Sequence, residues 1–258
     1  MIKPVGIGLL LGLLSLVPLA AAERYRVGVE AIDYRPAYTG LDGRFSGAMR
    51  ELLDAFAAAQ GIEFSYQPLP VPRLYASFWQ GHIDFKFPDN PNWRQAQRLD
   101  KTIHYSRSVL RYVDGTLVLA HQQPGRIDAI DTLGTVVGFT PWAWQQAIAT
   151  EQVRLRQNAD VAALMRQLLA GRVDAAYANV AVARYHLQQM PTPAKTVVFD
   201  PSLPYSKGSY HLATLNQPEL LAAFDQWLSD QAETVTALKR RHGLQAVAVD
   251  APVPLTGE

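Results

Sequence analysis

The sequence predicts an α/β fold in which a mainly parallel β-sheet is covered by helices on both faces. Two observations support this prediction. Segments with strand patterning alternate with segments with helical patterning along most of the 258 residues, and such alternation is typical of parallel sheets. The composition is 48% hydrophobic and 18% charged, as expected of a chain with a packed core. The length suits one large α/β domain or two smaller lobes.

Residues 1–22 have the pattern of a secretory signal peptide. Lys3 is followed by an apolar run from Val5 to Leu19, and small alanines then precede Glu23. A positive start, an apolar run of this length and a small-residue site are typical of a cleaved signal. The alternative is a transmembrane anchor, which needs about 20 apolar residues. We expect cleavage near Ala22 and export to the periplasm, without a lipid anchor because the chain has no cysteine.

The first half of the chain is predicted to contain three strands and two helices. Apolar residues recur at helical spacing after Ser46, and Gly61 is a natural helix end. Pro72 fits the start of a second, shorter helix, and Pro88 ends the third strand. The predicted strands span 25–29, 62–66 and 83–87, and the helices span 46–60 and 72–80.

The second half continues the alternation. Thr140 and Pro141 are suited to the start of a helix, and Gly171 and Gly243 are suited to helix ends. The predicted strands span 115–120, 136–139 and 173–177, and the helices span 141–149, 161–169, 179–188 and a final pair up to 243. Residues 244–258 have no periodicity and are predicted to be a frayed tail.

Composition and motifs exclude several classes of function. The net charge is +1, with 24 basic and 23 acidic residues, which argues against a nucleic-acid partner. The absence of cysteine excludes disulfides, thiol nucleophiles and thiolate metal sites. The six histidines lack metal-ligand spacing, and no nucleophile elbow or phosphate-binding loop is present. We therefore expect no metal, no cofactor and no enzymatic activity.

Ligands of parallel sheets bind beyond the carboxyl ends of the strands. This rule points to the stretches that follow the predicted strands ending at 29, 87, 139 and 177. Several aromatic residues lie there and are either core residues or part of a cleft for a flat, partly apolar or cationic ligand. These residues are Tyr34, Tyr38, Trp93, Trp142 and Trp144. Because residues two apart cannot share a helix face, we expect one of the last two to be packed inward and the other free.

A series of short motifs occurs in a fixed order between Tyr25 and Gly243. They are Arg26 to Val29, Asp42 to Gly47, Gly81 to Phe85, His104 to Ser106, Asp131 to Gly138, Leu169 to Ala175, and Pro218 to Leu221. Together they resemble the periplasmic solute-binding proteins of family 3, which serve polar amino-acid ABC importers. In this resemblance Asp84 and Asp174 are acids that define the fold rather than ligand contacts.

The resemblance implies a two-lobed, type II periplasmic-binding-protein-like fold, with a ligand cleft between the lobes. Lobe one would comprise residues 23–114 plus 205–243, and lobe two residues 115–204. The chain would cross between the lobes near Asp114-Gly115 and near Pro204-Tyr205, and the lobes would close around the ligand by a hinge motion.

The resemblance also implies positions for ligand contacts. The family pattern S-x-S-x-T-x-x-R binds a ligand carboxylate, and here only Arg94 matches it, because the hydroxyl residues are absent. Arg98 is an alternative whose distance from Tyr105-Ser106 fits the family spacing better. An arginine fork is well suited to a carboxylate. Asn179 replaces the acid that binds the ligand ammonium, which disfavours a zwitterionic α-amino acid; Asn179 is equally suited to capping a helix.

Further candidates come from the same region. Lys86 lies in an apolar strand, so it either pairs with Asp84 or Asp89 or faces the cleft. Asp89 and Asn90 are suited to ligand contact or to a turn, and Arg73 occupies a position where relatives often carry a cleft-facing arginine. The candidate ligand-binding residues are therefore Tyr34, Tyr38, Arg73, Lys86, Asp89, Asn90, Trp93, Arg94, Trp142 and Asn179.

Three functions are compatible with this resemblance. The first is a periplasmic protein that delivers a small polar, carboxylate-bearing solute to an inner-membrane ABC permease. The second is a ligand sensor that docks on a membrane receptor. The third is an enzyme similar to the cyclohexadienyl dehydratases, with Asp89, Arg73 and Arg94 at its site. In each case the expected partner is a small molecule, and we expect a monomer.

Overall fold

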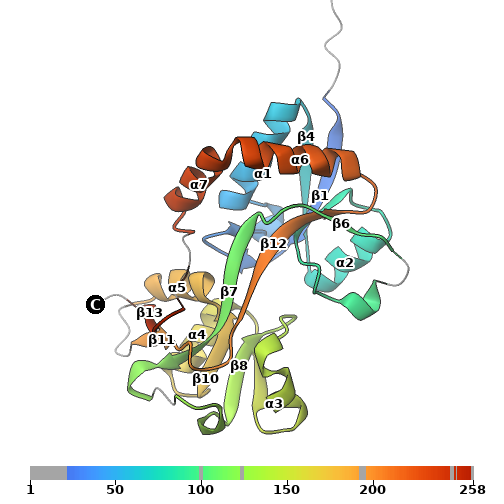
Figure 1. Cartoon of the computed structure of the whole chain (residues 1–258). Helices are drawn as coiled ribbons and strands as arrows, with labels where there is room; N and C mark the ends of the chain where they lie inside the picture. Colours follow the sequence, from blue (N-terminus) through green and yellow to red (C-terminus); the bar gives the residue numbers. More distant parts are fainter. Residues whose placement is uncertain are drawn as a thin grey trace, which may run out of the picture.

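The computed structural model describes residues 22–98, 101–122, 125–191, 196–244, 247 and 249–256. The predicted signal peptide, apart from Ala22, lies outside the described residues. Within them, no helix is long and apolar enough to cross a membrane. The chain forms two lobes, which lie one above the other in Figure 1. Two long strands, β7 (Leu110–Leu119) and β12 (Ser206–Thr214), run between the lobes side by side.

Lobe one is built on the parallel strands β1 (Arg24–Glu30), β4 (Glu63–Leu69) and β5 (Phe85–Asp89). Its helices are α1 (Ala48–Gln60), α2 (Val71–Trp79), α6 (Pro218–Asp230) and α7 (Ala232–Arg241). Short strands β2 (Asp33–Tyr34), β3 (Tyr38–Thr39) and β6 (His104–Tyr105) complete it. The rings of Phe56 and Phe224 lie 5.0 Å apart and join α1 to α6.

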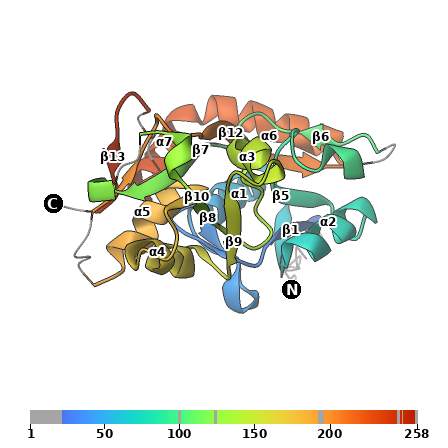
Figure 2. The same ribbon diagram turned by 90° about the horizontal axis from the view of Figure 1, so that it is seen from below.

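Lobe two contains the parallel strands β8 (Thr132–Val136), β9 (Arg154–Asn158) and β10 (Ala175–Asn179), and β11 (Val197–Phe199) pairs with β7. Its helices are α3 (Gln145–Ala149), α4 (Val161–Leu169) and α5 (Val180–Gln188). Successive residues of β10 belong to different core clusters: Ala175 packs with Trp144 beside α3, and Ala176 packs with Leu164 of α4. Helices therefore cover both faces of this sheet, as Figure 2 shows from below.

The strands join in the order β4-β1-β5-β12-β7-β10-β8-β9. The main strands of each lobe pair in parallel, and the pairs that involve β7 and β12 are antiparallel, as are the short pairs β2–β3 and β11–β13. The predicted α/β class and two-lobed architecture are confirmed, and the sheet is mixed because of the crossing strands.

Each lobe uses an aspartate to fix its sheet, as predicted for Asp84 and Asp174. The carboxylate of Asp84 accepts a hydrogen bond of 2.7 Å from the backbone N–H of Arg26 on β1. The carboxylate of Asp174 accepts one of 2.8 Å from the backbone N–H of Thr132 on β8. Each acid thus ties the turn before one strand to the beginning of its neighbour.

Some predicted boundaries are wrong. The strand predicted at 83–87 begins later, at Phe85, and the strand predicted at 136–139 lies earlier, as β8. Val137 cannot continue β8 into the core because it is 60% exposed, and Gly138 turns the chain with a φ of 85°. The strand predicted at 115–120 is only the second half of β7.

The predicted frayed tail is also corrected. Strand β13 (Val253–Pro254) pairs antiparallel with β11 in lobe two. The next residue, Leu255, is 2% exposed and donates its backbone N–H to Val197 at 2.9 Å. This segment is too short to show periodicity in the sequence. It is ordered because it pairs with the edge of the sheet at β11. Because α7 packs against α1 in lobe one, the chain returns to lobe two after α7 (Figure 1).

Candidate functional site

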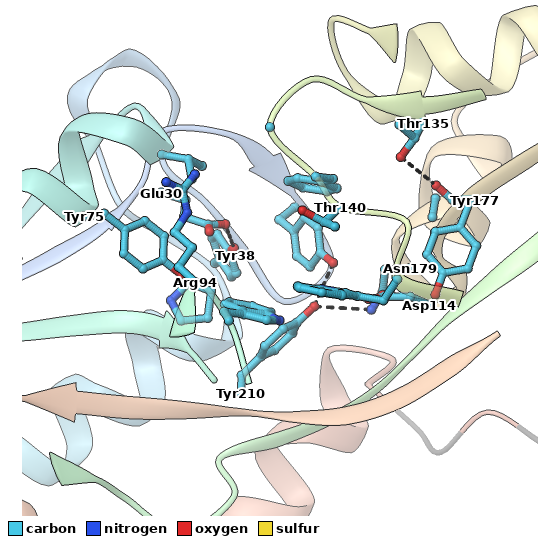
Figure 3. A pocket seen from close by; sticks show the side chains of 18 residues that line it. Glu30, Tyr38, Tyr75, Arg94, Asp114, Thr135, Thr140, Tyr177, Asn179 and Tyr210 are labelled. Atoms are coloured by element: carbon cyan, nitrogen blue, oxygen red, sulfur yellow. Dashed lines mark hydrogen bonds between the residues drawn. The ribbon is translucent and has the colours of Figure 1, made fainter. Parts of the chain in front are cut away.

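A cleft with about 780 Å³ of empty space, counting its open mouth, lies between the lobes. It is located where strands β1, β5, β8 and β10 end, as the sheet rule predicts. Both lobes and both crossing strands contribute side chains to its wall (Figure 3). The lining residues are Glu30, Tyr34, Tyr38, Val71, Tyr75, Pro88, Trp93, Arg94, Asp114, Thr135, Gly138, Phe139, Thr140, Trp142, Tyr177, Ala178, Asn179 and Tyr210.

Aromatic side chains form much of the wall. Tyr34 stacks on Tyr38 with ring centres 5.3 Å apart, and its hydroxyl lies 2.7 Å from that of Tyr210 on β12. Phe139 of lobe two meets Tyr34 edge-on at 5.8 Å. Contacts therefore already link the two lobes across the cleft. Such π faces are suited to flat or cationic ligand groups.

The two tryptophans after β8 have different environments, as predicted. Trp142 is 47% exposed and lines the cleft. Trp144 is fully buried, and its Nε1 donates to Thr116 Oγ1 at 2.9 Å. Trp142 can therefore cover a ligand, whereas Trp144 belongs to the core of lobe two.

Among the described residues that line the cleft, Arg94 is the only arginine or lysine. Its backbone is left-handed, with φ 47°, and its guanidinium lies 4.4 Å from the ring centre of Tyr75. Nη1 donates to Gln97 at 3.1 Å, and the remaining donors are available to a ligand. Arg98, the alternative, instead donates to the backbone carbonyls of Asn90 and Trp93 at 3.0 and 2.6 Å. These bonds hold the loop that runs from Asn90 to Arg98.

Lys86 and Asp89 form a buried ion pair and do not line the cleft. Lys86 is fully buried and Asp89 is 1% exposed. Lys86 Nζ lies 3.2 Å from Asp89 Oδ1, donates to the Pro88 carbonyl at 2.8 Å, and sits 4.0 Å from the ring centre of Tyr75. Burial lowers the pKa of Lys86, and the Asp89 carboxylate opposes this effect. Of the alternatives open for Lys86, the structure has the pair with Asp89.

Two further candidates lie away from the lining. Asn90 forms the turn that its residue type also predicted: Oδ1 accepts from the N–H of Asn92 at 2.8 Å, and Nδ2 donates to the Ser209 carbonyl at 2.9 Å. Arg73 is exposed on α2. Of the ten candidates, Arg73, Lys86, Asp89 and Asn90 are therefore not cleft residues, and the other six, Tyr34, Tyr38, Trp93, Arg94, Trp142 and Asn179, all line it.

Asn179 caps helix α5. Its Oδ1 accepts from the backbone N–H groups of Ala181 and Val182 at 3.0 and 3.1 Å, and its Nδ2 lies 3.5 Å from the Tyr210 hydroxyl. The capping role is confirmed, and Asn179 also lines the cleft. Because its oxygen is engaged in capping, the polar group that it offers to the cleft is a donor.

The sequence analysis missed two acids in the wall, Glu30 and Asp114. Glu30 is 7% exposed and accepts a hydrogen bond of 2.6 Å from Tyr38; burial raises its pKa. Burial also raises the pKa of Asp114 to about 7, although the Asn179 amide lowers it somewhat. Glu30 directly follows the first strand, at a flagged position. Asp114 is the one acid in β7, whose other charged residue is Arg111, and an acid inside a mostly apolar strand was the available signal.

Among the described residues, no group of histidines and acids is arranged to hold a metal ion. The chemistry of the site is therefore carried by one guanidinium, two buried carboxyls and the aromatic wall.

Comparisons with known proteins identify the fold. No protein-family model matches the sequence, and a comparison with curated proteins gave no match. Among solved structures, the chain is similar to ArtJ, an arginine-, lysine- and histidine-binding protein from Geobacillus stearothermophilus. The identity is 19% and the TM-score 0.68, over 88% of this chain and 98% of ArtJ.

Two other structures are similar. One is AncCDT-1, an ancestral amino acid-binding protein described as a precursor of cyclohexadienyl dehydratase, with 19% identity and TM-score 0.66 over 86% and 95% of the two chains. The other is substrate-binding domain 2 of GlnP from Lactococcus lactis in an open conformation, with 17% identity and TM-score 0.59 over 88% and 98%. The chain thus has the two-lobed fold of the family 3 amino-acid-binding proteins, as the sequence resemblance implied.

Proposed function

We propose that this chain is a periplasmic solute-binding protein that captures a small polar, carboxylate-bearing solute and delivers it to an ABC-type importer. The observation that carries the proposal is the interlobe cleft, whose wall comes from both lobes and holds Arg94. The similar structures support it, because their names describe amino-acid or substrate binding, for ArtJ that of arginine, lysine and histidine.

The cleft suggests how a solute would be held. Arg94 is positioned by its stack on Tyr75 and its bond to Gln97, so its free donors can form the paired bonds that a carboxylate accepts. Phe139 and Trp142, in the loop after β8, would cover the solute from lobe two. Rotation of the lobes about β7 and β12 would open and close this enclosure.

A thermal-shift screen of the mature chain, refolded to remove bound ligand, tests the proposal. The panel contains amino acids, polyamines, dicarboxylates and aromatic acids. A solute at about a hundred times its Kd stabilises the folded chain by about 2.7 kcal/mol, which raises Tm by roughly 5–10 °C for a chain of this size. A panel that leaves Tm unchanged would count against a solute-binding role.

Charge reversal tests the role of Arg94. We expect Arg94→Glu to abolish binding of a carboxylate solute without unfolding the chain, since a repulsive charge replaces the guanidinium. The matched control is Arg73→Glu, an exposed arginine outside the cleft, which should bind normally. An unchanged Kd in Arg94→Glu would show that Arg94 does not hold the solute.

A dehydratase-like activity is a second candidate, favoured by one observation. Glu30 is a buried acid with a raised pKa in the cleft wall, and such a group can act as a general acid. Asp89, the acid first considered for this role, is engaged with Lys86. Loss of prephenate absorbance on incubation with the chain, and its abolition in Glu30→Gln, would establish the activity. Unchanged absorbance would exclude it.

A further inference from the structure

Among the residues that the structure describes, the carboxyl group of Asp114 has no counter-ion. Asp114 lies in the middle of β7, where it pairs in register with Asn179 of β10 and Ser206 of β12. It lines the cleft, and its Oδ1 is buried without a hydrogen-bond partner among the described residues. None of the ion pairs in the described part of the chain includes it. A buried carboxylate without a partner destabilises a fold. A positively charged group of a bound ligand would supply the missing partner.

Four tyrosines and an amide are the described groups that interact with Asp114. The tyrosines near it are Tyr34 on β2, Tyr112 on β7 itself, Tyr177 on β10 and Tyr210 on β12. Burial raises the pKa of each tyrosine, and the charge of Asp114 raises it further. The amide of Asn179 also interacts with Asp114. A positive ligand group at this place would meet a carboxyl oxygen together with aromatic rings, and both favour a cation.

The charges of the whole lining agree with this. Glu30 and Asp114 are its two acids, and Arg94 is the only described basic residue in it. Lys86 is not among the lining residues, and its charge is paired with the buried Asp89. Arg94 comes from lobe one, whereas Asp114 lies on the crossing strand beside lobe two (Figure 3). Of the two acids, Glu30 lies near Arg94 in lobe one, so Asp114 is the acid that lies apart from the basic residue.

We propose that Asp114 is the counter-ion for a positively charged group of the bound solute, an organic ammonium or guanidinium. This inference rests on the proposed solute-binding function and narrows its carboxylate-bearing ligand to one that also carries a positive charge, such as a zwitterion. The inference reverses the expectation, based on Asn179, that a zwitterionic α-amino acid is disfavoured as the ligand. The missing negative charge is supplied by the residue opposite Asn179 on the neighbouring strand.

The test uses the mature chain and probes that share a skeleton but differ in charge. Phenylpropionate carries only a carboxylate, phenylethylamine only an ammonium, and phenylalanine both; arginine and agmatine repeat the comparison with a guanidinium. Thermal shift identifies the binders, and calorimetry gives Kd for the wild type and for Asp114→Asn, which keeps the shape of the side chain and removes the charge. We expect the cationic probes to bind, and Asp114→Asn to weaken their binding at least tenfold.

A second variant separates charge from fold. Asp114→Asn combined with Asn179→Asp moves the carboxylate to the opposite strand, and aspartate can still cap α5. We expect this double variant to recover cation binding to within a few fold of wild type. If it does not recover binding, the loss in Asp114→Asn is structural and the inference fails.

The outcomes also separate this inference from the function on which it rests. If the acid-only probe binds and the cationic probes do not, the solute-binding function stands and the role of Asp114 is wrong. Wild-type affinity of Asp114→Asn for a cationic probe overturns the role as well. If no probe of either class raises Tm, the proposed function itself fails, and this inference fails with it.

Discussion

Asp114 on β7 lies directly opposite Asn179 on β10, in the antiparallel ladder that connects the crossing strand to lobe two. Asn179 uses its oxygen to cap α5, while Asp114 keeps a buried carboxyl oxygen without a partner at the cleft. Helix capping and the negative charge of the cleft wall are therefore supplied by two different residues.

The raised pKa of Asp114 has a consequence for stability. Its folded-state pKa is about 7, above the value of about 3.9 for an exposed aspartate. The folded state therefore holds this proton more tightly than the unfolded state. As the pH rises from about 4 to about 7, the unfolded chain ionises first and the folded state loses stability, with no further loss above the folded-state pKa.

We therefore expect Asp114→Asn to have a higher Tm than wild type at pH 8.5, and the difference to shrink as the pH falls toward 4. Thermal unfolding of both ligand-free proteins across this range measures it. Glu233→Gln, a change at an exposed acid on α7, should run parallel to wild type. A lower Tm of Asp114→Asn at pH 8.5 would mean that the carboxylate has a stabilising partner in the folded state.

The order of the helices and strands was predictable because its signals are local. Helical spacing of apolar residues from Met49 to Phe56, ended by Gly61, predicts α1 closely. The short strands β2, β3 and β6 were not predicted, since two residues carry no periodicity and their pairing depends on distant partners. Strand β13 was missed for the same reason, because β11 decides its conformation.

The site was predictable only where the residues follow a strand end. Tyr34, Tyr38, Trp93 and Trp142 were found by this rule, and Arg94 and Asn179 were found through the family resemblance. Asp114 could not be found by it, because it lies within a strand and reaches the cleft only because β7 crosses between the lobes. The pairing of Lys86 with Asp89 was one of the alternatives considered, and only the burial of both side chains distinguishes it from a cleft position.

The ion pair of Lys86 and Asp89 is expected to matter for stability more than for ligand specificity. Lys86→Met would leave the Asp89 carboxylate buried without its partner, and removal of one member of a buried pair costs about 3–5 kcal/mol. Urea denaturation at pH 7 measures this loss. The double variant Lys86→Met with Asp89→Asn should recover a substantial part of it, because no isolated charge then remains.

The matched control for this pair is Arg73→Met, which removes an exposed positive charge from α2 and should change stability by less than about 0.5 kcal/mol. If Lys86→Met is as stable as this control, water or a structural rearrangement must satisfy Asp89, and the pair would not be required for the fold.

Asn179 is expected to contribute to stability through its cap. Asn179→Ala removes the acceptor for two backbone N–H groups at the start of α5 and should cost about 1 kcal/mol. Asn179→Ser retains an acceptor without adding a charge opposite Asp114, and it should remain within a few tenths of wild type in the same urea experiment. Equal stability of Asn179→Ala and wild type would indicate that solvent satisfies these donors.

The C-terminal segment is expected to stabilise lobe two. Leu255 is 2% exposed, and its backbone bonds to Val197 of β11. Leu255→Ala should therefore cost about 2–5 kcal/mol, the usual range for a buried leucine.

Truncation after residue 248 removes β13 as well and leaves β11 as an open edge. Hydrogen exchange of the amides at Val197, Val198 and Phe199 should then become faster, while exchange in α1 of lobe one should be unaffected. A truncation that removes only residues 257–258 retains β13 and serves as the control. Unchanged protection of β11 after the longer truncation would mean that β13 does not hold this edge in solution.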